Sequence, residues 1–304
     1  MWRTVRSGGI ERGYLLALPE DRDPARPSPL VLEFHGLTSN AAQQAEYSGL
    51  AAVATARGFV VATAQGSGRV PHWNYPGMPG VDDVAFVDDL VDAIADEVRI
   101  DDRRIFAAGI SNGAGLVMSM VSRVRRPLAG VAAVAGANIA RAGPRGVAVL
   151  AFHGTADPLV PYAGGRYFQG LGGPGGGQGR TGGGPVRRRL RARLAARAEA
   201  PRGARWGGLV NLPALPVEQT AADWARVNGC DATPTVNRVG DDVRHIAYAA
   251  RAGGPGVELF AVDGGGHVWP GARDVPVPML GRTTHTISAT AIVVERWSTI
   301  AGLR

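Results

Sequence analysis

A serine between two glycines stands at the junction of a predicted strand and a predicted helix. Residues 109–113 read Gly-Ile-Ser-Asn-Gly, after the apolar run 104–108 and before a helix-like run at 114–118. A turn this tight needs small residues beside the serine, and glycine, which has no Cβ, supplies them. The order strand, G-x-S-x-G, helix predicts that Ser111 is an exposed nucleophile at the end of a strand.

An acid and a histidine follow the serine, each after its own predicted strand. The run 147–152 is apolar throughout, typical of a strand buried on both faces, and leads to Asp157. The run 257–262 leads to His267 through three glycines, interpreted as a flexible loop that leaves the imidazole unobstructed. The order Ser, Asp, His is that of the α/β-hydrolases, whose sites form at the carboxyl edge of the sheet. We predict Ser111 as nucleophile, His267 as general base and Asp157 as the orienting acid.

An oxyanion hole is expected from an earlier strand. Residues 29–34 form that strand, and His-Gly-Leu-Thr follows it. The predicted donors are the backbone N–H groups of Leu37 and Asn112. Substrate contacts are predicted on nearby loops at Thr38, Trp73, Tyr75 and Trp269. For the two tryptophans, packing beneath the loops is the alternative.

Other residues compete for these roles. Asp263 is a rival acid, but it is too near His267 in sequence to come from a separate strand. His245 alternates with apolar residues and is interpreted as part of a sheet face, while His35 and His153 are interpreted as structural. The remaining rival bases are His72 and His285.

No metal or cofactor is predicted. The chain has no zinc-ligand spacing, no Walker loop and no G-x-G-x-x-G after a first strand. One acidic cluster is interpreted as helix N-terminal and solvent-facing charge rather than as a metal site; it consists of Asp82, Asp83, Asp88 and Asp89.

The alternation of predicted strands and helices indicates βαβ units and a mostly parallel, doubly wound sheet flanked by helices, the α/β-hydrolase fold. Strands are expected at 13–18, 30–34, 59–64, 105–110, 131–136, 147–152, 243–249 and 257–262. Helices are expected at 40–57, 81–98, 112–124, 217–228 and 288–300. A chain of 304 residues can form one such domain, covering residues 1–304.

A Gly/Arg-rich insertion interrupts the chain between the predicted acid and base, at about residues 166–206. All 33 basic residues of the chain are arginine, and ten of them lie within 164–208. The net charge of +7 is therefore local, and we predict no nucleic-acid partner. Three interpretations of the insertion stay open: a mobile lid or polymer-docking helix, a disordered insertion, and the product of a compensated frameshift.

The chain resembles the polyhydroxybutyrate depolymerase and feruloyl esterase group, related to carbohydrate esterase family one. The motifs that carry the resemblance are Phe-His-Gly at 34–36, Gly-Val-Asp-Asp-Val at 80–84, residues 109–113, His-Gly-Thr-Ala-Asp-Pro at 153–158 and Gly-Gly-Gly-His-Val-Trp-Pro-Gly at 264–271. It implies a secreted serine esterase that acts on polyester or plant-wall esters. The alternatives are a peptidase or thioesterase with the same triad, and a non-catalytic polymer-binding protein on a hydrolase body.

The chain also departs from that group. Members often carry cysteines after the His-Gly of the oxyanion loop, where this chain has Leu37, but here Cys230 is the only cysteine and no intrachain disulfide is possible. No signal peptide is visible, so a cytoplasmic location is the alternative to secretion. No run is long enough to span a membrane, and we expect a monomer that takes an ester substrate, possibly polymeric.

Overall fold

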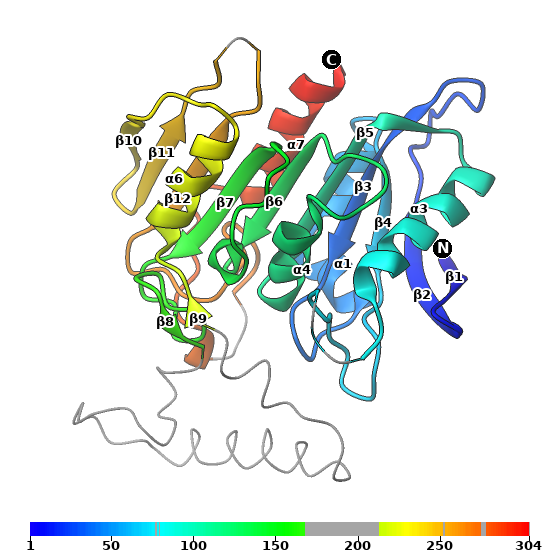
Figure 1. The fold of residues 1–304 in the computed structure, drawn as a ribbon, viewed down its shortest axis with the longest axis horizontal. Helices are drawn as coiled ribbons and strands as arrows, with labels where there is room; N and C mark the ends of the chain where they lie inside the picture. Colours follow the sequence, from blue (N-terminus) through cyan, green and yellow to red (C-terminus); the bar gives the residue numbers. More distant parts are fainter. Residues whose placement is uncertain (77, 79, 168–212, 252, 275–277, 304) are drawn as a thin grey trace.

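A ten-stranded sheet forms the centre of the molecule (Figure 1). The computed structural model describes residues 1–76, 78, 80–167, 213–251, 253–274 and 278–303. In spatial order the strands are β1 (Trp2–Ser7), β2 (Ile10–Ala17), β4 (Val60–Ala64), β3 (Ser28–Phe34), β5 (Ile100–Ile110), β6 (Gly130–Val134), β7 (Ala148–Gly154), β12 (Val257–Val262), β11 (Val243–Tyr248) and β10 (Thr235–Val239). The strands from β4 to β12 in this order are parallel, and the two pairings at each end of the sheet, β1–β2 and β2–β4 at one and β12–β11 and β11–β10 at the other, are antiparallel. The predicted mostly parallel sheet is confirmed.

Helices cover both faces of the sheet. They are α1 (Ala41–Ser48), α2 (Leu50–Thr55), α3 (Asp83–Glu97), α4 (Asn112–Met120), α6 (Val217–Val227) and α7 (Ala289–Ala301). In the view of Figure 1, α3, α4 and α6 lie in front of the sheet and α1 and α7 behind it.

Each face of the sheet has its own apolar core. Side chains alternate along a strand, so neighbouring residues face opposite sides. Along β3, Leu30 and Leu32 pack into the core beneath α3, α4 and α6, while Val31 packs into the core beneath α2 and α7. The apolar runs of the central strands follow from this burial on both faces.

Two of the ten strands of the central sheet, and a break in one helix, differ from the sequence prediction. The edge strands β1 and β10 were not expected, and β10 is exposed along most of its length, so it lacks the apolar run that marks the central strands. The predicted helix 40–57 is two helices, because Gly49 adopts φ +63° between α1 and α2. A left-handed residue ends one helix, and glycine adopts it without steric cost.

Two short strands join the chain on either side of the Gly/Arg-rich segment. The strand β8 (Gly165–Arg166) pairs antiparallel with β9 (Pro213–Ala214), so Arg166 lies opposite Pro213. Beside them Val160, Tyr167 and Ala214 form a small apolar cluster. From residue 168 onward, the insertion predicted at about 166–206 lies outside the described residues.

We expect that residues 168–212 can be replaced by a short Gly-Ser linker without loss of the fold. A short turn suffices to join two paired antiparallel strands, and loop-closure entropy changes little with loop length. The melting temperature is expected to shift by less than about 3 °C, which corresponds to roughly 1 kcal/mol for a chain of this size. Thermal unfolding and hydrolysis of a soluble short-chain ester measure the effect. Insoluble protein or a melting temperature lowered by about 10 °C would show that the segment is part of the folding core.

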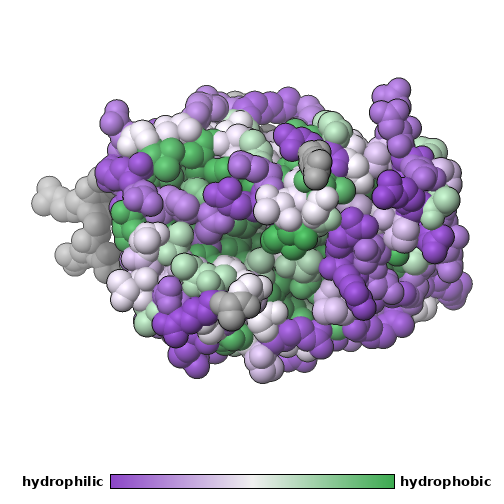
Figure 2. Space-filling model, turned by 90° about the horizontal axis from the view of Figure 1, so that it is seen from above, coloured by the Kyte–Doolittle hydropathy of each residue, from purple (hydrophilic) through white to green (hydrophobic). Residues whose placement is uncertain are grey.

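The end of the molecule where the C-terminus lies is polar at its rim. Figure 2 shows this end, opposite the end where β8 and β9 lie, with hydrophilic residues around the edge and apolar residues visible in the hollow between them. In the part of the chain that the structure describes, no helix combines the length and apolarity that a membrane span requires.

Candidate active site

Ser111 occupies the turn between β5 and α4 with strained backbone geometry. Its φ of +56° and ψ of −119° are rare for a residue with a Cβ, and its N–H donates to Val134 O at 2.9 Å. Two other described non-glycine residues have positive φ, Thr38 just beyond β3 and Ala135 directly after β6. Such strain persists only where the surroundings fix it, and it concentrates at functional sites. All three residues lie at the carboxyl edge of the parallel strands.

The glycines beside Ser111 are required by close contacts. A Cβ on Gly109 would lie 2.5 Å from the carbonyl carbon of Gly113, and one on Gly113 would lie 2.3 Å from Phe34 O. The absence of a side chain at Gly109 allows the turn to be tight. The absence of a side chain at Gly113 allows the start of α4 to pack against the end of β3. The predicted donors on these two elements are therefore brought next to each other.

Asp157 and His267 are hydrogen-bonded at the carboxyl ends of β7 and β12. His267 Nδ1 lies 2.8 Å from Asp157 Oδ2, and both side chains are buried. The other carboxylate oxygen, Oδ1, accepts the backbone N–H groups of Leu159 at 2.8 Å and Val160 at 2.9 Å. The carboxylate is thus fixed from both sides, and its geometry suits a group that orients an imidazole.

The charge of Asp157 is stabilised by its neighbours. Burial alone would raise the pKa of this carboxyl, but His267 and the hydrogen bonds from His153 and His267 outweigh burial and lower the pKa well below its ordinary value. His153 Nε2 lies 3.3 Å from Asp157 Oδ2 and 2.9 Å from Val160 O. A carbonyl oxygen only accepts, so Nε2 carries the proton of His153.

The glycines before His267 pack closely instead of forming the flexible loop that the sequence suggested. A Cβ on Gly266 would lie 2.0 Å from Leu280 O, and one on Gly154 would lie 2.2 Å from Gly265 O. The Gly266 N–H donates to Arg282 O at 2.9 Å. The loop that carries the acid and the loop that carries the histidine are therefore in direct backbone contact, which side chains at these positions would prevent.

The serine and the histidine are not hydrogen-bonded to each other. Within the described residues, the Ser111 hydroxyl has no hydrogen-bond partner, and the side chain is half-buried. Contacts of this kind are often long in the absence of substrate and tighten when it binds. The shared sheet edge places all three residues on one side of the molecule, and their roles as nucleophile, base and acid stay predictions.

The two predicted oxyanion donors lie at the start of α4 and in the loop after β3. Asn112 is the first residue of α4, where the N–H groups have no partner within the helix and the helix dipole favours negative charge. Leu37 is half-buried, and no backbone carbonyl among the described residues accepts its N–H. Both amides are thus available to an oxyanion.

The four predicted substrate contacts divide into two kinds. Thr38 is exposed and Tyr75 half-buried, so both are accessible from solvent. Trp73 and Trp269 are fully buried; the Trp269 indole donates to Thr290 Oγ1 at 3.0 Å within the core beneath α7. Neither tryptophan has an exposed surface, so the predicted aromatic wall is not observed, and the packing alternative describes them.

Sequence reasoning missed a buried acid and a buried ion pair. Glu33, in the middle of β3, accepts hydrogen bonds from Gln44, Ser48 and Thr63, and burial raises its pKa. Asp83 is the first residue of α3, as the helix N-terminal interpretation expected, but it does not face solvent: it is 1% exposed and paired with Arg12 at 2.7 Å. The sequence signals were the acid Glu33 among the apolar residues of β3 and the arginine Arg12 at an inward position of β2.

His35 makes the loop after β3 sensitive to acid. Its Nδ1 lies 2.7 Å from Gly36 O and its Nε2 accepts the Gly66 N–H at 2.9 Å, so the fold requires the neutral imidazole. Burial is the main cause that lowers the pKa of His35 from 6.5 to about 4. Between these values the unfolded chain binds a proton that the folded chain does not. Stability is therefore full above pH 6.5 and is lost as the pH falls toward 4.

We expect His35 to lower the free energy of unfolding by on the order of 3 kcal/mol as the pH falls from about 7 to 4. The free energy of unfolding, measured in urea across this range, checks the value. The variant His35→Gln is expected to flatten the pH dependence, whereas His285→Gln, at an exposed histidine, is expected to leave it unchanged. Equal slopes in the native chain and His35→Gln would contradict the assignment.

Comparison with known proteins finds similarity to several esterases. A family model described as Esterase PHB depolymerase matches residues 13–157, a stretch that contains Ser111 and Asp157 and ends before His267. NocK of Nocardia uniformis subsp. tsuyamanensis, which carries the provisional name of an esterase, is 28% identical over 96% of this chain and 81% of its own length. The feruloyl esterase B of Piromyces equi is 25% identical over 84% of this chain, but the match covers 42% of that protein.

A further relative and a solved structure extend the comparison. The bifunctional acetylxylan esterase/xylanase XynS20E of Neocallimastix patriciarum is 28% identical over 52% of this chain and 23% of its own length. The acetyl xylan esterase from Aspergillus awamori has a TM-score of 0.56 and 13% identity, with 88% of this chain and 94% of that one covered. The predicted resemblance, the α/β-hydrolase fold and the prediction of an ester-hydrolysing enzyme are confirmed.

Proposed function

We propose that the chain hydrolyses carboxylic esters through an acyl-enzyme formed on Ser111. The observation that carries the proposal is the buried hydrogen bond between His267 Nδ1 and Asp157 Oδ2, at the same sheet edge as the strained Ser111. With its Nδ1 proton held by Asp157, His267 presents an unprotonated Nε2, which is the form that accepts a proton from a serine hydroxyl.

The reaction proceeds in two steps. His267 takes the Ser111 proton as the oxygen attacks the ester carbonyl, and the developing oxyanion is held by the N–H groups of Leu37 and Asn112. The alcohol leaves with the proton from His267. Water, deprotonated by the same imidazole, then releases the acid and restores the serine. Every proton passes through His267, and Asp157 stays ionised throughout.

Polyesters or hydroxycinnamoyl esters of plant-wall type are the proposed substrates. The resemblance to the PHB depolymerase family model and the relatives named as feruloyl and acetylxylan esterases support this class. We also propose that the protein is secreted, as its resemblance to this group implies. A peptidase or thioesterase with the same residues is the alternative, because one such arrangement serves all three reactions.

Fluorophosphonate labelling and a substrate panel test the proposal together. The labelled peptide is expected to contain Ser111, with one label per chain, as shown by mass spectrometry. The panel consists of hydroxybutyrate oligomers, feruloyl esters, short nitrophenyl esters, a thioester and a peptide amide. Turnover of oxygen esters well above the thioester and the amide supports the proposal. Absence of labelling, or labelling at another residue, would overturn it.

A further inference from the structure

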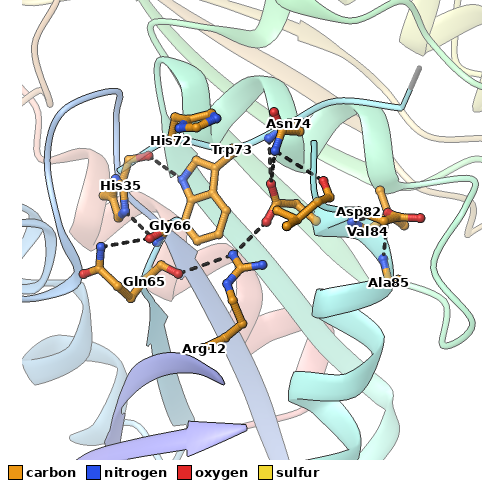
Figure 3. Close-up of polar contacts among 12 residues, drawn as sticks. Arg12, His35, Gln65, Gly66, His72, Trp73, Asn74, Asp82, Val84 and Ala85 are labelled. Carbon is orange, nitrogen blue, oxygen red and sulfur yellow. Dashed lines mark hydrogen bonds and ion pairs between the residues drawn. The ribbon is translucent and has the colours of Figure 1, made fainter. Parts of the chain in front are cut away.

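The segment 71–75 contacts both elements that carry the proposed oxyanion donors, the loop after β3 and the start of α4. On the side of β3, the Thr38 N–H donates to Pro71 O at 3.0 Å, and the Trp73 indole Nε1 donates to His35 O at 2.9 Å (Figure 3). His35 and Thr38 lie on either side of the loop that contains Leu37. The backbone around that amide is therefore held from both directions.

The same segment clamps the first residue of α4. The Trp73 N–H donates to Asn112 Oδ1 at 2.7 Å, and Asn112 Nδ2 donates back to Trp73 O at 3.0 Å. Asn112 Nδ2 also donates to the Tyr75 hydroxyl at 2.7 Å, which in turn donates to Asn112 O at 3.1 Å. Side chain and backbone of Asn112 are both fixed, so its own N–H has one orientation.

A buried ion pair anchors this segment from below. Asn74 donates its backbone N–H to Asp83 Oδ2 at 2.7 Å, and Asp83 Oδ1 pairs with Arg12 at 2.7 Å (Figure 3). The Arg12 side chain is 3% exposed and its guanidinium lies 3.8 Å from the centre of the Phe86 ring. A buried pair holds its geometry firmly, because either partner alone would leave an uncompensated charge.

The Trp73 ring itself is enclosed. It is fully buried, packs edge-on against Phe34 at 5.2 Å and stacks with Phe86 at 6.2 Å between ring centres. The indole N–H is the polar group of this side chain, and it donates to His35 O. The ring therefore acts on the site through the atoms it holds and not by contact with a substrate.

We propose that Trp73 is a positioning residue that sets the separation of the two oxyanion donors, Leu37 and Asn112. The inference rests on the proposed function. The strands β3 and β5 fix where the two elements begin, but the loop after β3 and the turn after β5 are joined at their tips by Trp73. Donors that are fixed in advance stabilise the developing charge without reorganising, so a shift of their separation lowers the rate of the chemical step.

The test is the variant Trp73→Phe, which keeps an aromatic ring and removes the bond to His35 O. We expect kcat to fall about 10- to 100-fold, less than or equal to the loss of one donor, while KM changes by less than about threefold. The loss is expected to be the same factor for esters that differ in acyl and in alcohol group. The inhibition constant of a trifluoromethyl ketone, whose adduct carries an oxyanion, is expected to rise by the same factor as kcat/KM falls.

Matched variants separate positioning from packing. Trp224→Phe removes the same atoms from a fully buried ring whose indole N–H has no partner among the described residues, and it is expected to lower stability without changing kcat. Tyr75→Phe removes only the hydroxyl bound to Asn112 and is expected to lower kcat in the same substrate-independent way. Tyr162→Phe, whose exposed hydroxyl bonds Glu218, is its control.

The outcomes are distinct. An unchanged kcat in Trp73→Phe and in Tyr75→Phe, or a loss that appears in KM and varies between esters, overturns the inference and returns Trp73 to packing or substrate contact. Complete fluorophosphonate labelling of Trp73→Phe at Ser111, with reduced kcat, supports it. If the native chain neither takes the label nor hydrolyses esters, the proposed function is overturned instead. The native chain is therefore measured before any variant.

Discussion

Replacement of Ser111 by alanine is expected to lower kcat for ester hydrolysis by about 10⁴- to 10⁶-fold and to abolish fluorophosphonate labelling. Without the hydroxyl there is no acyl-enzyme, and the remaining rate comes from binding and from the oxyanion donors. Alanine is a matched replacement because it retains the Cβ at φ +56°, so the strain of the turn is unchanged. The melting temperature is therefore expected to stay within about 3 °C, less than the effect of a buried large-to-small change in a chain of this size.

Active-site titration guards this experiment against trace native enzyme. Ser122→Ala, at a serine that lies after α4 and bonds the Arg145 N–H, is the control and is expected to retain full activity. Residual turnover of Ser111→Ala above about one percent, after the titration, would exclude the acyl-enzyme mechanism as the main route.

Replacement of Asp157 by asparagine is expected to lower kcat on the order of 10⁴-fold, the size seen when an orienting acid loses its charge in triad enzymes. The structure fixes how the new amide would lie. Its oxygen must take the position of Oδ1, which accepts the N–H groups of Leu159 and Val160. The NH₂ group then faces His267 Nδ1 and forces it to accept, which places the imidazole proton on Nε2, where a base is needed.

Asp263→Asn is the matched control for this prediction. Asp263 is close to His267 in sequence, but its carboxylate bonds Arg238 and Arg244 at 3.3 Å each. It is expected to leave kcat within about twofold, since its ion pairs are partly exposed and contribute little. If Asp157→Asn retained more than a tenth of native activity while Asp263→Asn lost it, the acid would be Asp263.

The central sheet was predictable because burial on both faces leaves an apolar run that the sequence displays. Edge strands carry no such signal: β10 is mostly exposed and β1 alternates weakly, so neither was found. The order of the strands along the chain was enough to predict that Ser111, Asp157 and His267 lie at one edge of the sheet, because parallel strands end on the same side. Their hydrogen bonding could not follow from order.

Individual contacts around the site were less accessible to sequence reasoning. Trp269 is two residues from His267, and proximity in sequence suggested a wall for substrate, but its ring points into the core beneath α7. The glycines before His267 suggested flexibility, whereas they serve close backbone packing. Asp83 is the helix N-terminal residue that the sequence suggested, but it does not face solvent, and only the inward direction of Arg12 on β2 reveals the pair. These contacts depend on elements that are distant in the chain.

The pairing of β7 with β12 has a consequence for how activity appears during folding. These strands carry the acid and the histidine, and they meet in register at Val149 and Val257 although a third of the chain separates them. Contacts between distant segments form late, because loop closure must be paid before they stabilise the chain. A chain that lacks its C-terminal third, whether nascent or truncated, therefore holds Ser111 but lacks His267, the predicted base. Recovery of esterase activity would report completion of the whole sheet, later than the recovery of helical signal.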